Sequence, residues 1–327
     1  MNKPPYEVTG SILNLYGQIN ERLGRCRGLM LIRPEAQLRR ENRIRTIQSS
    51  LAIEGNSLEI EQVTAILDNK RVIAPAREIL EVQNAILAYD QLRIIDPLLK
   101  EDFLKMHGLL VKGLVEEAGI YRSKAVGIMK GYEVKNIAPG PQMVPGLMNN
   151  LFDYLRIDSD PNIIKSCVFH YEMEFVHPFQ DGNGRMGRIW QTRILMDENP
   201  IFEYLPIEAA IKNNQSGYYQ ALADADSQGK STVFIDFILR RILESLDEVL
   251  SVSGNRVVDY QTRANFALSQ LEGWFDRKRY LDVCKNVSTA TASRDLKQMI
   301  HDNIVELSGS GRMTRYRKNL TSRPTLS

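Results

Sequence analysis

Apolar residues recur at helical spacing along most of the chain, whereas the alternating apolar and polar runs typical of β-strands are scarce. The clearest helix is expected between Asp160-Pro161, a helix-start signal, and His177-Pro178, where the proline should end it. Its inward-facing residues are Ile164, Cys167, Val168, Tyr171 and Phe175. This pattern predicts an all-α protein with small β accessories.

The same spacing predicts other helices on both sides of this one. They cover about 43–53, 59–67, 76–92, 102–114 and 144–155 before it, and about 183–196, 207–225 and 232–252 after it. Apolar residues on both sides of Lys130-Gly131 are typical of a β-hairpin. A helical core with a hairpin as an accessory is therefore expected.

The length of 327 residues favours two or three domains. We assign residues 1–98 to an N-terminal helical region, 99–252 to a core and 256–320 to a C-terminal domain. That last domain should hold helices at about 259–271, 277–286 and 289–302, then strands at 304–307 and 313–317. Three helices and a hairpin in this order are typical of a winged helix-turn-helix.

The C-terminal end is basic, although the whole chain has a net charge of only +2. From Trp274 to Ser327 there are 11 Lys or Arg and 5 Asp or Glu. Residues that could face a DNA groove or its phosphates are Thr289, Thr291, Arg294, Lys297, Arg312, Arg315 and Arg317. Because winged helices also serve as docking or dimer elements, DNA, a protein and a homodimer all stay open.

The composition excludes several other classes of protein. The three cysteines, Cys26, Cys167 and Cys284, are far apart, so no disulfide framework is expected and a cytoplasmic location fits best. No apolar run approaches the ~18 residues of a membrane span. We therefore expect no membrane partner.

The segment 177–188 combines residue types that suit a polyphosphate. Gly182 and Gly184 stand at the expected start of a helix, where free N–H groups and the helix dipole favour anions. Arg185 and Arg188 lie three residues apart on its first turn, where they oppose the dipole unless an anion binds them. Guanidinium groups match phosphate oxygens in geometry.

Three further polar residues of this segment could take part in chemistry. Asn183 could donate an amide hydrogen bond into the same pocket. Asp181 is a hard oxygen ligand for an Mg²⁺ that bridges phosphates. His177 titrates near neutral pH and could accept a proton from an attacking hydroxyl.

The order of these residues resembles the full signature of the Fic family of protein AMP transferases. The signature reads His177-Pro178-Phe179-x-Asp181-Gly182-Asn183-Gly184-Arg185-x-x-Arg188. Gly119-x-Tyr121-Arg122 with the hairpin after it, and Tyr218-Tyr219-x-Ala221-Leu222, extend the resemblance over most of the chain. It implies a Fic-type helical bundle with a β-hairpin flap that transfers AMP from ATP to a Tyr, Ser or Thr hydroxyl of a target protein.

The resemblance also implies a role for each residue of the signature. His177 would be the base, and Asp181 the Mg²⁺ ligand. Residues 182–184 would form the anion-binding loop, with Arg185 and Arg188 on the phosphates and Arg188 at the γ-phosphate. Glycine at 184, where a kinase-like branch has lysine, favours AMP transfer.

Residues outside the signature take roles from the same resemblance. The flap would bring Ile128, Met129, Lys130 and Gly131 near the nucleotide and the target. Tyr218 and Tyr219 would close the adenine pocket, while the role of Asp226 beyond them stays open.

A carboxylate interrupts an apolar stripe before the core. Glu54 follows Ile47 and Leu51 at helical spacing, which is costly unless the charge is paired. The run Ser50-Leu51-Ala52-Ile53-Glu54-Gly55 resembles the family's inhibitory motif. We expect Glu54, with Ser50 one turn before it, to pair with Arg188 and deny the γ-phosphate its partner.

Other functions fit the same residues. The chain could remove AMP from a modified target, transfer another nucleotide or modify itself. It could also be a DNA-binding regulator that uses the Fic core as a nucleotide sensor. The intact His177, Asp181 and Arg188 favour active chemistry.

Overall fold

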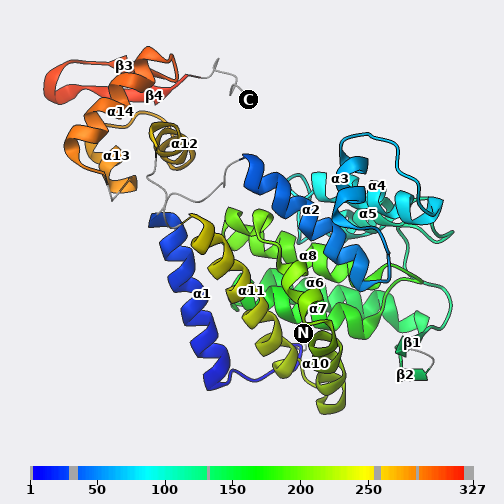
Figure 1. Ribbon diagram of the computed structural model, residues 1–327. Helices are drawn as coiled ribbons and strands as arrows, with labels where there is room; N and C mark the ends of the chain where they lie inside the picture. The colour runs from blue at the N-terminus through cyan, green and yellow to red at the C-terminus, as the bar shows by residue number, and fades with distance from the viewer. Residues whose placement is uncertain (1–2, 29–35, 131–132, 254–258, 285–286, 320–327) are drawn as a thin grey trace. The chain divides into compact units, whose positions relative to one another are not determined.

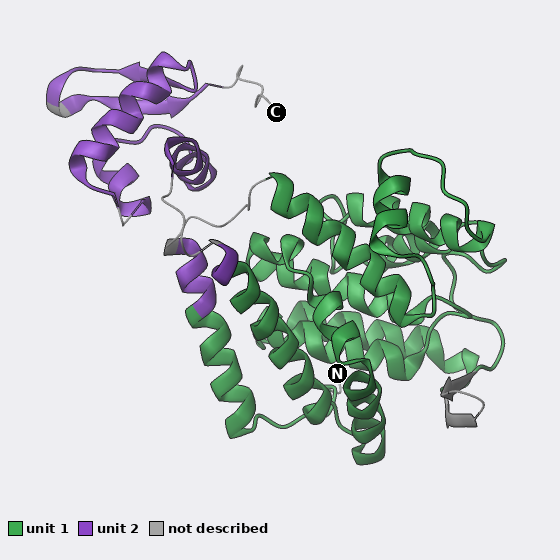
Figure 2. Cartoon of the chain, in the orientation of Figure 1, with its two compact units in different colours: residues 1–21, 34–249 green, residues 22–33, 250–327 purple. Residues whose placement is uncertain are grey.

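The computed structural model describes residues 3–28, 36–130, 133–253, 259–284 and 287–319. The chain forms two compact units (Figure 2). One comprises residues 1–21 and 34–249, and the other residues 22–33 and 250–327. No helix among the described residues is both long enough and apolar enough to cross a membrane.

The first unit is helical, as the spacing predicts. Its helices are α2 (Ala36–Ile53), α3 (Ile60–Leu67), α4 (Ala76–Asp90), α5 (Lys100–Leu110), α6 (Val144–Ile157), α7 (Asn162–Val176), α8 (Asn183–Glu198), α9 (Ile207–Asn213) and α10 (Gln215–Gln228) (Figure 1). Two more helices, α1 (Gly10–Gly28) and α11 (Thr232–Ser253), begin in this unit and end in the other. The all-α prediction is confirmed, and α1 is a helix in addition to those predicted.

The predicted hairpin is present between α5 and α6. Strand β1 (Gly127–Lys130) pairs antiparallel with β2 (Glu133–Ile137), and their register shifts between Ile128 and Met129. Gly131, predicted as part of the flap, lies outside the described residues.

Helices α7 and α8 pack on each other at the centre of the first unit. The apolar residues Met186, Ile189, Trp190 and Ile194 of α8 are all buried. Trp190 meets Phe103 edge-on, with 5.0 Å between the ring centroids. Gly187 permits the close approach of the two helices, because a Cβ there would lie 2.6 Å from Cδ2 of His170.

Two predictions for α7 are wrong. Phe175 is 45 % exposed, because it stands in the last turn and its ring stacks on Tyr171 instead of entering the core. Asp160 does not cap the helix, which begins at Asn162 after Pro161. Its carboxylate instead accepts hydrogen bonds from Lys3 and from the hydroxyls of Tyr6 and Tyr154, so distant donors displace the local cap.

The single helix predicted for 207–225 is also wrong. The backbone leaves helical geometry at Asn214, with φ −130° and ψ 47°, and this residue separates α9 from α10. Asparagine favours such breaks because its short amide competes with the helix for backbone hydrogen bonds. Beyond the break, Gln215 donates from Nε2 to the carbonyl of Ile53 at the end of α2.

The second unit has its own apolar core. It contains α12 (Tyr260–Gln270), α13 (Arg277–Val283) and α14 (Thr289–His301), followed by antiparallel strands β3 (Val305–Ser308) and β4 (Arg315–Lys318). Ala292, Leu296 and Met299 of α14 are buried, and Ile300 is partly buried. The order of elements is the predicted one, while the winged-helix assignment stays a prediction.

Candidate active site

The loop between α7 and α8 is held in an uncommon backbone conformation. His177 ends α7 with φ 49° and ψ 59°, in the left-handed region that few side chains adopt. Gly182 precedes α8 with φ 84°, and a Cβ there would lie 2.8 Å from Cγ1 of Val111. Glycine at 182 is therefore required both by the turn and by the packing against α5.

Asn183 stabilises this loop from inside, which corrects the prediction that its amide points into the pocket. Its Oδ1 accepts from the N–H of Phe179 and its Nδ2 donates to the carbonyl of Phe179, both at 2.9 Å. The side chain is buried, and the Phe179 ring is also buried and stacks on His107 with centroids 3.6 Å apart. Both polar ends of the amide are thus used within the loop.

Two residues outside the segment hold the loop from other elements. Arg122, which is buried, donates from Nε to the carbonyl of His177 at 2.7 Å, and its N–H donates to the carbonyl of Pro178. His107 lies 3.0 Å from the carbonyl of Asp181, and its Nδ1 accepts from Gly119 at 3.0 Å. Burial lowers the pKa of His107 to about 4, so its ring is neutral and Nε2 donates.

The imidazole of His177 is suited to act as a base. Its Nδ1 lies 3.3 Å from the carbonyl of Glu174, which can only accept, so the neutral ring carries its proton there. The lone pair is then on Nε2. Desolvation lowers the pKa of His177 below its ordinary value, against the weaker effect of the Glu174 carbonyl. The ring therefore stays unprotonated at neutral pH.

Arg188 is held by the end of α2. Its Nη2 donates to Glu54 Oε1 and to the carbonyl of Ser50, both at 2.8 Å, and its Nε donates to the Ser50 hydroxyl at 3.1 Å. The guanidinium side chain is 1 % exposed. The structure therefore places Ser50, Glu54 and Arg188 together, as the sequence predicts.

The Glu54 carboxylate also lies against the start of α8. Any Cβ on Gly184 would overlap Oε1 of Glu54. Glycine at 184 therefore lets a carboxylate reach the backbone at this helix end, where the free N–H groups favour an anion.

Arg185 and Asp181 face each other beside this helix end. Arg185 Nη2 donates to Asp181 Oδ1 at 3.2 Å, and Arg77 of α4 donates to Asp181 Oδ2 at 3.3 Å. The N–H of Gly182 also donates to Oδ1, at 2.6 Å. The Asp181 side chain is 42 % exposed, so a carboxylate oxygen remains within reach of solvent.

Of the two predicted adenine-pocket tyrosines, Tyr218 lies in the core and Tyr219 lies next to the end of α2. Tyr218 is buried and its hydroxyl lies 3.1 Å from Nε2 of His170. The Tyr219 hydroxyl donates to the carbonyl of Ile53, one residue before Glu54. Asp226 accepts from the hydroxyl of Tyr171 at 3.0 Å. The backbone of 128–130 forms strand β1, and the structure describes no side chains there.

Sequence reasoning missed one buried carboxylate near the site. Glu174 lies one turn before His177 on α7, and a Cβ on Gly187 of α8 would lie 3.1 Å from its Oε1. Burial, and next the Glu54 charge, raise the pKa of Glu174 to about 8. In the sequence, the one sign that Glu174 lies near the site is its position three residues, or one helical turn, before His177.

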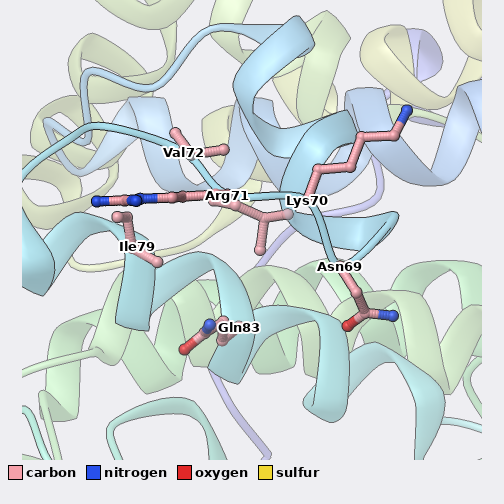
Figure 3. Close-up of a pocket in the computed structure, with 7 residues that line it drawn as sticks. Asn69, Lys70, Arg71, Val72, Ile79 and Gln83 are labelled. Atoms are coloured by element: carbon pink, nitrogen blue, oxygen red, sulfur yellow. The ribbon is translucent and has the colours of Figure 1, made fainter.

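A cavity of about 280 Å³ lies apart from this loop (Figure 3). It is lined by Ile66, Asn69, Lys70, Arg71, Val72, Ile79 and Gln83, from α3, α4 and their connection. None of these residues belongs to the segment 177–188. The geometry described above therefore defines the candidate site.

Comparison with known proteins places this site in a family. The model of the Fic/DOC family matches residues 97–195. Relatives include the protein adenylyltransferase Fic of Nematostella vectensis, 29 % identical over 63 % of this chain and 48 % of its own. A probable protein adenylyltransferase of Aquifex aeolicus is 33 % identical over 32 % of this chain and 33 % of its own. The chain thus spans half or less of these curated relatives.

Solved structures extend the likeness to the whole chain. A Fic family protein from Desulfovibrio desulfuricans G20 is 40 % identical, with a TM-score of 0.75, over 98 % of this chain and 100 % of its own. Fic-1 from C. elegans shares the fold at 22 % identity, with a TM-score of 0.58 over 75 % of this chain and 72 % of its own. Because the first likeness is high in identity and covers both chains, this chain belongs to the Fic family.

Proposed function

We propose that this protein transfers AMP from ATP to a Tyr, Ser or Thr hydroxyl of a target protein. The observation that carries the proposal is the arrangement of the loop, which places His177 at the end of α7, the helix start at Gly184 and the buried Arg188 within twelve residues of one another. The names of the curated relatives support the same activity. Incorporation of label from α-labelled ATP, detailed in the Discussion, tests it.

The reaction is an in-line displacement at the α-phosphorus. The target oxygen forms a bond to this phosphorus, the bond to the oxygen that bridges to the β-phosphate breaks, and pyrophosphate leaves. Nε2 of His177 accepts the hydroxyl proton. The N–H groups at the start of α8, Arg185 and Arg188 would stabilise the phosphate charge.

Asp181 fits the role of an Mg²⁺ ligand. The described residues contain no group of three His, Cys, Asp or Glu arranged for a metal ion. Mg²⁺ in nucleotide sites needs only one or two carboxylates, since phosphates and water supply the rest. The half-exposed Asp181 carboxylate beside Arg185 offers such a ligand. A bound Mg²⁺ would neutralise phosphate charge.

Glu54 acts as a brake on this reaction. Its carboxylate takes the Nη2 donor of Arg188 and fills the space over Gly184. ATP would then bind with its γ-phosphate displaced and its α-phosphorus out of line with the incoming hydroxyl. Ser50 adds two hydrogen bonds that keep Arg188 turned toward α2.

The pH dependence of the transfer rate should follow the protonation of His177. With Glu54 replaced by glycine, the rate is expected to stay level as the pH falls to about 6.5 and to decline only below it, because the pKa of this base lies under its ordinary value. Initial rates in buffers from pH 5 to 8, with circular dichroism to monitor folding, measure this. A decline centred above pH 7 would contradict the assignment.

The second unit is proposed to dock a macromolecule, with duplex DNA as the candidate that the exposed basic residues favour. Lys297 on α14 and Arg315 and Lys318 on β4 are exposed. We expect a shift of labelled duplex at low ionic strength that weakens steeply as salt rises. Failure to shift duplex at low salt would leave protein docking as the function of this unit.

Two alternatives to AMP transfer assign a different reaction to the same site. The chain could remove AMP from a modified target or transfer another nucleotide. It could also be a DNA-binding regulator whose Fic core only senses a nucleotide. The His177 variant described in the Discussion separates such a sensor from a transferase, since sensing requires no base.

A further inference from the structure

Each arginine of the motif faces a carboxylate from outside the motif. Arg188 is bound by Glu54, and Nη1 of Arg185 lies 3.9 Å from Oε1 of Glu81 on α4. The side chains of Arg185 and Glu81 are 6 % and 15 % exposed. Water therefore screens this pair little, and their attraction reaches across 3.9 Å without a direct hydrogen bond.

Glu81 is held by the segment that carries the brake and by Arg77 of its own helix, whose Nε lies 3.6 Å from Oε1. Its Oε2 accepts from Nδ2 of Asn56 at 2.8 Å. Asn56 follows Glu54 by two residues, and its N–H donates to the carbonyl of Leu51 at 3.1 Å. The end of α2 thus holds Arg188 directly through Glu54 and Arg185 indirectly through Asn56 and Glu81.

Both arginines keep a buried N–H that lacks an acceptor among the described residues. These are Nε of Arg185 and Nη1 of Arg188. Buried donors are nearly always paired, and a charged donor without an acceptor is costly. Two such donors on one helix end indicate that an anion with several oxygens completes the site.

We propose that Glu81 is a positioning residue that forms a second restraint, holding Arg185 away from the phosphates of the nucleotide. This inference rests on the proposed function, because the phosphates are what compete with Glu81. Removal of Glu54 takes away the charged partner of Arg188 but leaves Arg185 attracted to α4. Binding of the phosphates by both arginines therefore also requires that Glu81 releases Arg185.

Titration calorimetry with ADP and with adenosine tests this restraint. The parent is the Glu54→Gly protein, to which Glu81→Gln or Glu78→Gln is added. Glu78 is the matched control, since it lies on the same helix, loses the same charge and accepts from Ser57 instead of facing Arg185. We expect Glu81→Gln to tighten ADP binding about three- to fivefold more than Glu78→Gln, with adenosine binding unchanged.

Equal ADP affinities for the two glutamine variants would overturn the inference, as would weaker ADP binding by Glu81→Gln. Glu81→Asp, which withdraws the carboxylate while keeping its charge, should give a smaller change in the same direction. Thermal unfolding verifies that each variant is folded. Failure of the Glu54→Gly parent to bind ADP at all would instead overturn the proposed function, so the two failures are distinguishable.

Discussion

Replacement of Glu54 by glycine is expected to raise the rate of AMP incorporation about 30-fold. Glu54 accepts a 2.8 Å hydrogen bond from the buried Arg188 and lies against Gly184, where a phosphate would bind. A hydrogen bond to a charged group contributes roughly 2 kcal/mol, which corresponds to this factor. The measurement is transfer of label from α-labelled ATP, in Mg²⁺, to the protein itself and to proteins of a cell extract.

The matched control for this variant is Glu61→Gly. Glu61 lies exposed on the first turn of α3, seven residues further along the chain. The control changes the same side chain and the same charge without touching Arg188, so its rate should stay near that of the unchanged protein. Equal labelling by the Glu54 variant and this control would contradict the brake.

The second large effect is expected at His177. In the Glu54→Gly background, His177→Ala should lower the transfer rate between about 100- and 10,000-fold, the contribution of a positioned base. The ring carries its free lone pair on Nε2, and no phosphate contact is assigned to it. The affinity for ATP should therefore change by no more than about twofold.

His301→Ala serves as the control for the histidine variant. His301 is exposed at the end of α14 in the second unit, remote in sequence from the motif. Its replacement should leave transfer unchanged. If His177→Ala kept full label incorporation, the base assignment would be wrong. If a cellular effect of the protein survived in His177→Ala while labelling was lost, the nucleotide-sensor alternative would gain support.

Local signals allowed the site to be predicted from sequence to a large extent. The left-handed turn at Gly182 and the helix end before Pro178 have causes that lie within a few residues. The structure brings Glu54 and Ser50 to Arg188, as predicted. A charged residue on an apolar stripe requires some partner, and the resemblance of residues 50–55 to the family's inhibitory motif pointed to Arg188 as that partner.

Contacts between distant segments could not be predicted in this way. Arg122 and His107 hold the loop through its carbonyl groups, and a sequence gives no sign of which carbonyl a side chain will reach. The Asn183 side chain points into the loop because its amide can bond to both the N–H and the carbonyl of Phe179. Glu81 faces Arg185 only because α4 packs beside the motif.

The errors in the fold have a similar origin. Helical spacing shows which face of a segment is apolar, but it does not show where the neighbouring helices stop covering that face. Phe175 is exposed for this reason. The Asp160 cap is lost because the Asp160 carboxylate accepts hydrogen bonds from Lys3, Tyr6 and Tyr154 instead of from the helix.

The most direct test of the central proposal uses two labels of ATP in parallel. The Glu54→Gly protein is incubated with Mg²⁺ and a heat-treated cell extract, whose own kinases are inactive, with either α-labelled or γ-labelled ATP, and the labelled proteins are digested and identified by mass spectrometry. The proposal predicts label from the α position alone, as AMP on a Tyr, Ser or Thr hydroxyl. Label from the γ position on protein, or none from the α position, would contradict it.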